Sequence, residues 1–128
     1  ENDGIANNPK FKFGDNIKFL TAAKHGKLYG FDEFWSVYRR NEGGMTVRDG
    51  NLKWAKILIE HYKAIEETFG FMLRKNLCKE YISDKYVYLI RRSKNDIGAL
   101  LNNVLYGIID GRWPFIKKAF NTWILRRK

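Results

Sequence analysis

The apolar residues in the second half of the chain recur at the period of an α-helix, and this constrains the fold more than any other feature. Between positions 52 and 69, one helical face would carry Leu58, Tyr62, Ile65 and Phe69, with charged residues between them. Gly70 is expected to end or kink this helix. The pattern therefore predicts an amphipathic helix that packs one face against a core.

Further helices are expected towards the C-terminus. One would run from about 71 to 92, with a break near Ser83–Asp84. Another would run over 97–109, capped by Asn95 or Asp96 and ended by Gly111. The fourth has Pro114 in its first turn, where a missing N–H leaves no helical hydrogen bond unmade. Residues 51–128 are thus predicted to be about four helices.

The first half predicts a more mixed structure. A helix is expected from Asp15 to about position 25, closed by Gly26, with Phe19 widening its apolar face. The plain structural interpretation of Asp15 is a helix N-cap. The segments 27–31 and 34–39 are short and aromatic and would form one or two strands. A glycine-rich loop follows them.

The charge of the chain is uneven. The 128 residues carry a net +10, yet residues 1–70 hold 11 basic and 10 acidic side chains, whereas residues 71–128 hold 13 and 4. A basic half suggests an anionic partner, either a lipid surface or nucleic acid. The chain begins with Glu1 and not with Met, so we expect it to be a piece of a longer protein.

Several kinds of chemistry are excluded by residue types. The single cysteine, Cys78, rules out a disulfide scaffold and fits a reducing compartment. Its plain interpretation is an inert buried thiol. The two histidines lie far apart, so His25 is expected to be a cation at a helix end and His61 to lie on a helix flank. The sequence contains no phosphate-binding glycine loop and no zinc-type spacing.

One stretch, Phe13 to Thr46, resembles the C-terminal part of the catalytic domain of family 2 glycosyltransferases, which have the GT-A fold. The resemblance rests on three pieces in the family's order: Gly14-Asp15 opening a helix, the helix end from Ala22 to Lys27, and the loop from Tyr38 to Gly44. Each piece is short, and their combination at natural spacing is what makes the resemblance specific.

The resemblance implies that the chain transfers a sugar from a nucleotide donor to an acceptor hydroxyl with inversion, in polysaccharide or lipid-linked glycan synthesis. Asp15 would be the catalytic base, which suits a carboxylate held in direction by a helix. The donor phosphates would meet a loop with charge-assisted donors and an approachable backbone. Its residues are Tyr38, Arg39, Arg40, Asn41, Gly43 and Gly44.

Two departures from the family bear on activity. Asn41 stands where the family commonly has His, and no Asp-x-Asp for the divalent metal occurs in the chain. The resemblance implies a Mg or Mn ion in the full-length enzyme and none in this fragment. Since that ion neutralises much of the donor charge, we expect the fragment alone to be inactive.

The last helix predicts a contact with a membrane surface. Its apolar residues would share one face and its cations the other, as in a helix that lies in the membrane interface. The plain alternative is an ordinary core helix with a solvated basic face. The residues expected to face the membrane are Trp113, Ile116, Lys117, Lys118, Phe120, Trp123, Arg126, Arg127 and Lys128.

Together these patterns predict a mainly α fragment. Residues 1–50 would be the C-terminal, acceptor-side piece of an α/β GT-A domain with one or two short strands, and residues 51–128 a basic helical extension. The expected location is cytoplasmic, on or near the membrane face, and an uncovered sheet edge would favour a homo-oligomer. The competing hypothesis is a basic helical binding module for an anionic membrane or nucleic acid, although no nucleic-acid recognition motif is present.

Overall fold

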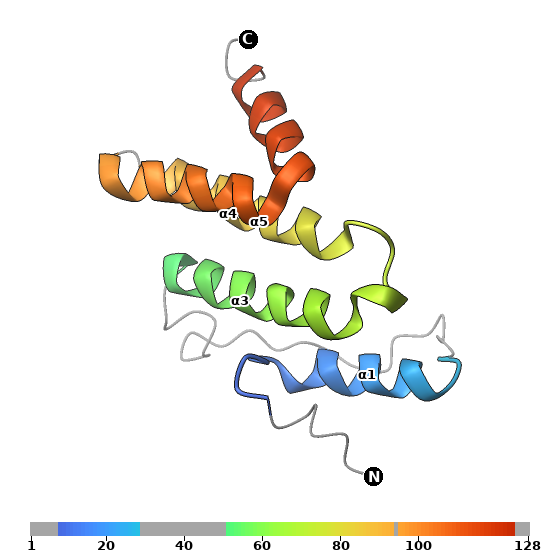
Figure 1. Cartoon of the computed structure of the whole chain (residues 1–128). Coiled ribbons are helices and arrows are strands. Elements are labelled where there is room, and N and C mark those ends of the chain that lie inside the picture. Colours follow the sequence, from blue (N-terminus) through green and yellow to red (C-terminus); the bar gives the residue numbers. More distant parts are fainter. Residues whose placement is uncertain (1–7, 29–50, 94, 125–128) are drawn as a thin grey trace, which may run out of the picture.

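The computed structural model describes residues 8–28, 51–93 and 95–124, with the backbone alone at 51, 123 and 124. These residues are mainly helical, as predicted, and no strand occurs among them. The predicted strand segments fall in residues 29–50, outside the described ranges, apart from positions 27 and 28, which are not in a strand. The elements are α1 (Gly14–His25), α3 (Asn51–Phe69), the 3-10 turn η2 (Gly70–Met72), α4 (Leu77–Arg92) and α5 (Ile97–Ile124) (Figure 1).

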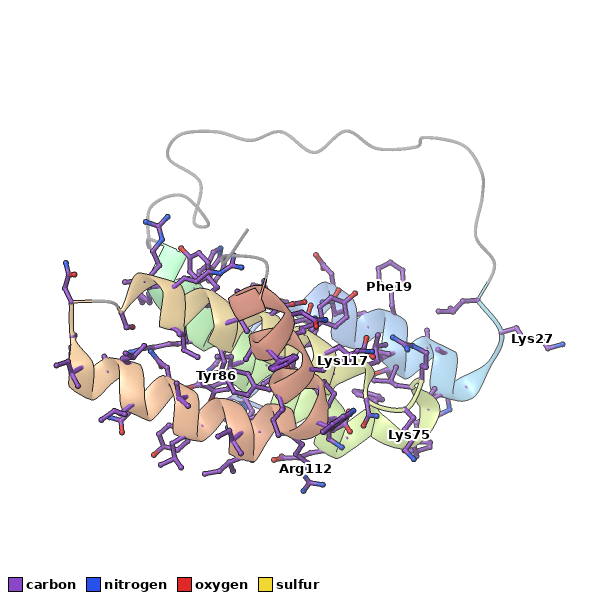
Figure 2. All side chains as sticks on the ribbon, turned by 90° about the horizontal axis from the view of Figure 1, so that it is seen from above. Phe19, Lys27, Lys75, Tyr86, Arg112 and Lys117 are labelled. Carbon is purple, nitrogen blue, oxygen red and sulfur yellow. The ribbon has the colours of Figure 1, made fainter. Side chains whose placement is uncertain are left out.

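Helix α1 ends where the sequence predicts. The N–H of Gly26 donates to the carbonyl of Ala22 at 3.1 Å and closes the last turn. Its start differs from the prediction, because the N-cap is Phe13 and Asp15 lies in the first turn without a capping bond. The prediction for Phe19 is wrong as well: its side chain is 64% exposed and projects away from the helix (Figure 2), because the buried row of α1 is narrow.

Helix α3 has the predicted bounds, whereas α4 begins later than predicted. It starts at Leu77 and not near position 71, because residues 70–72 form a 3-10 turn and Asn76 takes a left-handed conformation with φ 67°. The predicted break near Ser83 is absent. The Ser83 hydroxyl donates to the carbonyl of Lys79 one turn earlier, and α4 is continuous to Arg92.

Helix α5 follows its predicted cap and carries a sharp bend. The carboxylate of Asp96 accepts a hydrogen bond from the N–H of Ala99 at 2.9 Å, which confirms the cap. At Arg112 the backbone leaves the helical region (φ 50°, ψ −135°), and Pro114 lies in the first turn beyond it. The axis therefore changes direction there, and two helical stretches meet at this bend, as predicted from Gly111 and Pro114; both carry the label α5 (Figure 1).

The core consists of two clusters that share α3 and α4. Helix α3 lies between α1 and the pair α4 and α5 (Figure 1). One cluster joins α3, α4 and α5. The other joins α1, α3 and α4. The first contains Ala55, Ile59, Ile82, Tyr86, Leu89 and Phe115, and the second contains Ile17, Ile65, Phe69 and Cys78.

Candidate functional site

The segment that leads into α1 is attached to α3 through His61. The backbone N–H of Lys12 donates to His61 Nδ1 at 3.2 Å. The ring of Phe13 meets the imidazole edge-on, with centroids 4.8 Å apart and planes at 89°, and it also contacts Trp54. These contacts fix the residues immediately before Asp15, and with them the point where α1 begins.

His61 is buried in the interior and does not lie on a helix flank as predicted. Its side chain is fully buried, and burial lowers its pKa below the ordinary value of 6.5. Because Nδ1 accepts the Lys12 hydrogen bond, the neutral ring carries its proton on Nε2, which has no partner among the described residues. The neutral imidazole is therefore the form that suits this site.

Asp15 stands exposed in the first turn of α1. No hydrogen bond or ion pair joins its carboxylate to another described residue, so it faces solvent. The amide groups at the start of a helix favour a negative charge at this place. A groove of about 420 Å³ runs along the same helix from Gly14, lined by Phe11, Gly14, Ile17, Lys18, Thr21, Ala22 and His25.

The predicted donor-phosphate loop lies outside the described residues. Tyr38, Arg39, Arg40, Asn41, Gly43 and Gly44 all fall within 29–50. Asp15 is therefore the one member of the predicted catalytic set that the structure places.

A polar network that the sequence does not suggest joins α3, α4 and α5. Tyr86 Oη donates to Asp110 Oδ2 at 2.5 Å, and Lys63 Nζ lies 2.5 Å from the same oxygen. Burial, followed by the hydrogen bond to Asp110, raises the pKa of Tyr86. The sequence carries no signal of this network because its members come from three different helices. It lies beside a groove of about 640 Å³ between these helices.

Cys78 fits the prediction of an inert buried thiol. It lies in the cluster between α1, α3 and α4 and is almost fully buried. Burial, together with the nearby Glu66 carboxylate, raises its pKa to about 12, so the reactive thiolate is scarce at neutral pH. Within the described ranges, no group of three or more His, Cys, Asp or Glu side chains could hold a metal ion.

The residues predicted to face a membrane divide into three groups. Trp113, Ile116, Lys117 and Phe120 are exposed on α5. The side chain of Lys118 instead contacts α4, where its Nζ lies 2.6 Å from Asp84 Oδ1 and donates a hydrogen bond to the carbonyl of Glu80 at 3.1 Å. The third group is not described: the side chain of Trp123 and the residues Arg126, Arg127 and Lys128.

Comparisons with protein-family models, curated proteins and solved structures find no match to this chain. None of the described helices contains a stretch that is both long and apolar enough to cross a bilayer.

Proposed function

We propose that this chain is the acceptor-side C-terminal portion of an inverting family 2 glycosyltransferase. The observation that carries the proposal is the exposed Asp15 carboxylate in the first turn of α1, within the ordered set of motifs from Phe13 to Thr46. A general base must reach a proton on an incoming substrate, so it has to be accessible and held in direction. Asp15 meets both requirements because α1 is anchored on α3 through Ile17.

The proposed reaction is a single displacement. Asp15 takes the proton of the acceptor hydroxyl as that oxygen forms a bond to the anomeric carbon of the donor sugar. The bond from that carbon to the nucleotide phosphate breaks on the opposite face, and the nucleoside diphosphate leaves with the bonding electrons. Attack opposite to the leaving group inverts the anomeric centre. Removing a positioned base costs on the order of 10²–10⁴ in rate.

The donor side of the proposal belongs to residues outside the described ranges. Arg39 and Arg40 would supply charge-assisted donors to the pyrophosphate, with Gly43 and Gly44 allowing close backbone approach. A divalent metal would neutralise donor charge, but the described residues do not fit one, since they offer no grouped ligands. We therefore assign no step of the reaction to a metal held by this part of the chain.

The proposal includes a place in the cell and a set of substrates. The donor is a nucleotide sugar, the acceptor is a glycan or a lipid-linked glycan, and the product belongs to polysaccharide or glycolipid synthesis. A cytoplasmic location is supported by the single unpaired thiol of Cys78, because a reducing compartment keeps cysteines free.

The test is the substitution Asp15→Asn in the full-length enzyme. We expect kcat to fall by about 10²–10⁴, because asparagine cannot accept the acceptor proton, while the Kd for the nucleotide sugar changes less than about twofold. Asparagine keeps the size of the side chain, and loss of its charge costs the helix only about 0.3–1 kcal/mol. Turnover is measured with radiolabelled donor, and donor binding by calorimetry.

Glu60→Gln is the matched control, since Glu60 is an exposed carboxylate of α3 outside the motif. It should leave kcat and donor affinity unchanged. Undiminished turnover in the Asp15→Asn enzyme would refute the assignment of the base.

A further inference from the structure

Helix α5 carries a long row of exposed apolar side chains. In the part before the bend, Ile97, Leu101, Leu105 and Ile108 recur at intervals of three and four and so share one face. Each member of the row is between 44% and 72% exposed. We call this set the α5 stripe: Ile97, Leu101, Leu105, Ile108, Ile109, Trp113, Ile116 and Phe120.

The other side of α5 is the one that packs on α4. Gly107 and Gly111 are buried there, and a β-carbon at Gly111 would come within 2.6 Å of the Ser83 hydroxyl on α4. Phe115 fills the space beside both glycines and belongs to the core. The described helices therefore cover one face of α5 and leave the α5 stripe uncovered. An apolar surface of this length on a small domain marks an interaction site.

Between Ile97 and Phe120, the exposed charges beside the α5 stripe are cations. Arg112, which points outward from the bend, and Lys117 are both exposed, and neither is paired with a described residue (Figure 2). The one carboxylate of α5, Asp110, is turned inward onto Tyr86 and Lys63 and is only 13% exposed. Lys118 is held by Asp84. The exposed face of α5 thus presents apolar groups and cations, and the exposed carboxylate of Asp96 lies at its N-cap, where it accepts the N–H of Ala99.

We propose that the α5 stripe lies in the interface of an anionic lipid bilayer, with Arg112 and Lys117 meeting the lipid phosphates. This goes beyond sugar transfer and stands without it. The apolar side chains would enter the boundary between headgroups and acyl chains, while the long cationic side chains reach up to the phosphates. Trp113 and Phe120 are of the residue types that favour this depth.

A bilayer fits the surface better than a second copy of this chain does. Pairing two copies through the α5 stripe would offer Arg112 and Lys117 only the exposed carboxylate of Asp96 at the α5 N-cap, which already accepts the N–H of Ala99. An anionic lipid surface supplies the missing negative charge at every position along the helix. The charge pattern therefore favours lipid as the occupant.

The test is flotation of the 128-residue chain with liposomes of phosphatidylcholine containing 30% phosphatidylglycerol, alongside liposomes of phosphatidylcholine alone. We expect binding to the anionic vesicles and at least tenfold weaker binding to the neutral ones. Phe120→Ala should weaken the partition coefficient on the order of tenfold, because it removes a large apolar side chain from the interface. Leu101→Ser should weaken it similarly and would report on the part of α5 before the bend.

Charge is tested separately. Lys117→Gln removes one cation and should weaken binding about fivefold, and Lys117→Glu should weaken it about 25-fold, since each charge near the surface contributes a similar factor. High salt should reduce binding of the wild-type chain in the same direction.

Matched controls lie elsewhere on the surface. Phe71→Ala removes an equally large side chain that is 77% exposed in η2, and Lys75→Glu reverses an exposed charge just before α4. Both should change flotation less than twofold. Circular dichroism of every variant checks that the helices are retained.

Three results would overturn the proposal. If the wild-type chain stays at the bottom of the gradient with anionic vesicles, the proposal is refuted. Equal losses for Phe120→Ala and Phe71→Ala would show that binding follows general surface hydrophobicity. A concentration-dependent dimer in sedimentation velocity that Phe120→Ala dissociates, with flotation unchanged, would assign the α5 stripe to a second copy.

Discussion

His61 links the N-terminal segment to the helical core through a single ring. Its Nδ1 holds the Lys12 N–H, and its faces and edges contact Phe11, Phe13 and Tyr62. A protonated imidazole would carry a hydrogen on Nδ1 and would lose the bond to Lys12, besides placing a charge among aromatic rings. The neutral ring is therefore part of what holds the start of α1.

This arrangement predicts a pH dependence of stability. Burial lowers the pKa of His61 in the folded chain below 6.5, its value in the unfolded chain, so the unfolded chain binds more protons below that pH. The free energy of unfolding should be constant above about pH 7 on this account. It should fall, by up to about 1.4 kcal/mol per pH unit, as the pH goes down from about 6.5 towards the folded-state pKa.

Urea unfolding at pH 7.5 and 5.5 measures the effect. The variant His61→Gln has no titrating group and should lose that part of the pH dependence, whereas His25→Gln, at the exposed end of α1, should keep it. Identical pH profiles for the wild type and His61→Gln would contradict the role given to the buried ring.

Single residues show where sequence reasoning stops. His61 was expected on a helix flank, and its burial depends on Phe11 and Phe13, which belong to a segment far away in sequence. Asp15 was expected as an N-cap, which is the common role of aspartate before a helix, but the N-cap is Phe13, two residues earlier. Both differences come from the docking of the segment before α1, which local patterns do not encode.

At the scale of the element, the two parts of α5 on either side of the bend pack closely because two positions, Gly107 and Gly111, carry no side chain. A β-carbon at Gly107 would lie 2.5 Å from the ring of Phe115, and one at Gly111 would lie 2.6 Å from Phe115 Cβ. Because Phe115 is a buried ring in the core, it has little room to move aside. The bend at Arg112 thus folds the second part of α5 onto glycines of the first.

We predict that Gly107→Ala lowers the free energy of unfolding by about 1–3 kcal/mol, through overpacking against Phe115. Gly98→Ala is the matched control near the start of the same helix. There a β-carbon would meet only the Asp96 carboxylate oxygen at 3.4 Å, so alanine should raise stability by up to about 1 kcal/mol. Urea unfolding followed by circular dichroism compares the two, and a loss of equal size in both would exclude the close contact as the cause.

The elements themselves were largely predictable from the sequence. Local chemistry predicts four features: the end of α1 at Gly26, the bounds of α3, the Asp96 cap and the place of Pro114. The start of α4 was not predictable, because Asn76 adopts a left-handed conformation that the spacing of apolar residues does not reveal. The part of the α5 stripe before the bend was not predicted, for a similar reason. Apolar periodicity indicates that one helix face is apolar, but it does not show whether another part of this chain packs against that face.

The whole molecule is organised around two clusters that share α3 and α4. The cluster containing Ile17 and Cys78 depends on α1, whereas the cluster containing Phe115 does not. Loss of α1 from its place would uncover Cys78 while leaving the packing of α3, α4 and α5 intact. Local opening of this kind occurs below the free energy of global unfolding.

We predict that Ile17→Ala increases the rate at which Cys78 reacts with a thiol reagent under native conditions by at least tenfold. Truncating a buried isoleucine to alanine costs about 2–5 kcal/mol of packing free energy. Here the lost contacts are those that hold α1 against the other helices, so α1 should detach more often. The reaction is followed at pH 8 with an aromatic disulfide, with helicity monitored in parallel. Leu101→Ala, in the exposed α5 stripe, should leave the rate unchanged.

An equal rate in the wild type and Ile17→Ala would show that the docking of α1 does not control access to Cys78. The candidate site was predictable at this scale only in part. The sequence placed Asp15 at the start of a helix, but neither the anchoring of that helix by His61 nor the network of Tyr86, Asp110 and Lys63 follows from spacing along the chain.

The connections between α3, α4 and α5 also have a consequence for how the chain reaches its fold. Each of these helices packs on the next one in sequence, so the contacts that assemble them close short loops. The bond from Lys12 to His61 joins residues 49 positions apart and must close a long one. Contacts between near neighbours form faster than distant ones. We therefore expect the three C-terminal helices to pack together first. The segment that precedes α1 and positions Asp15 should be the last part to reach its native structure.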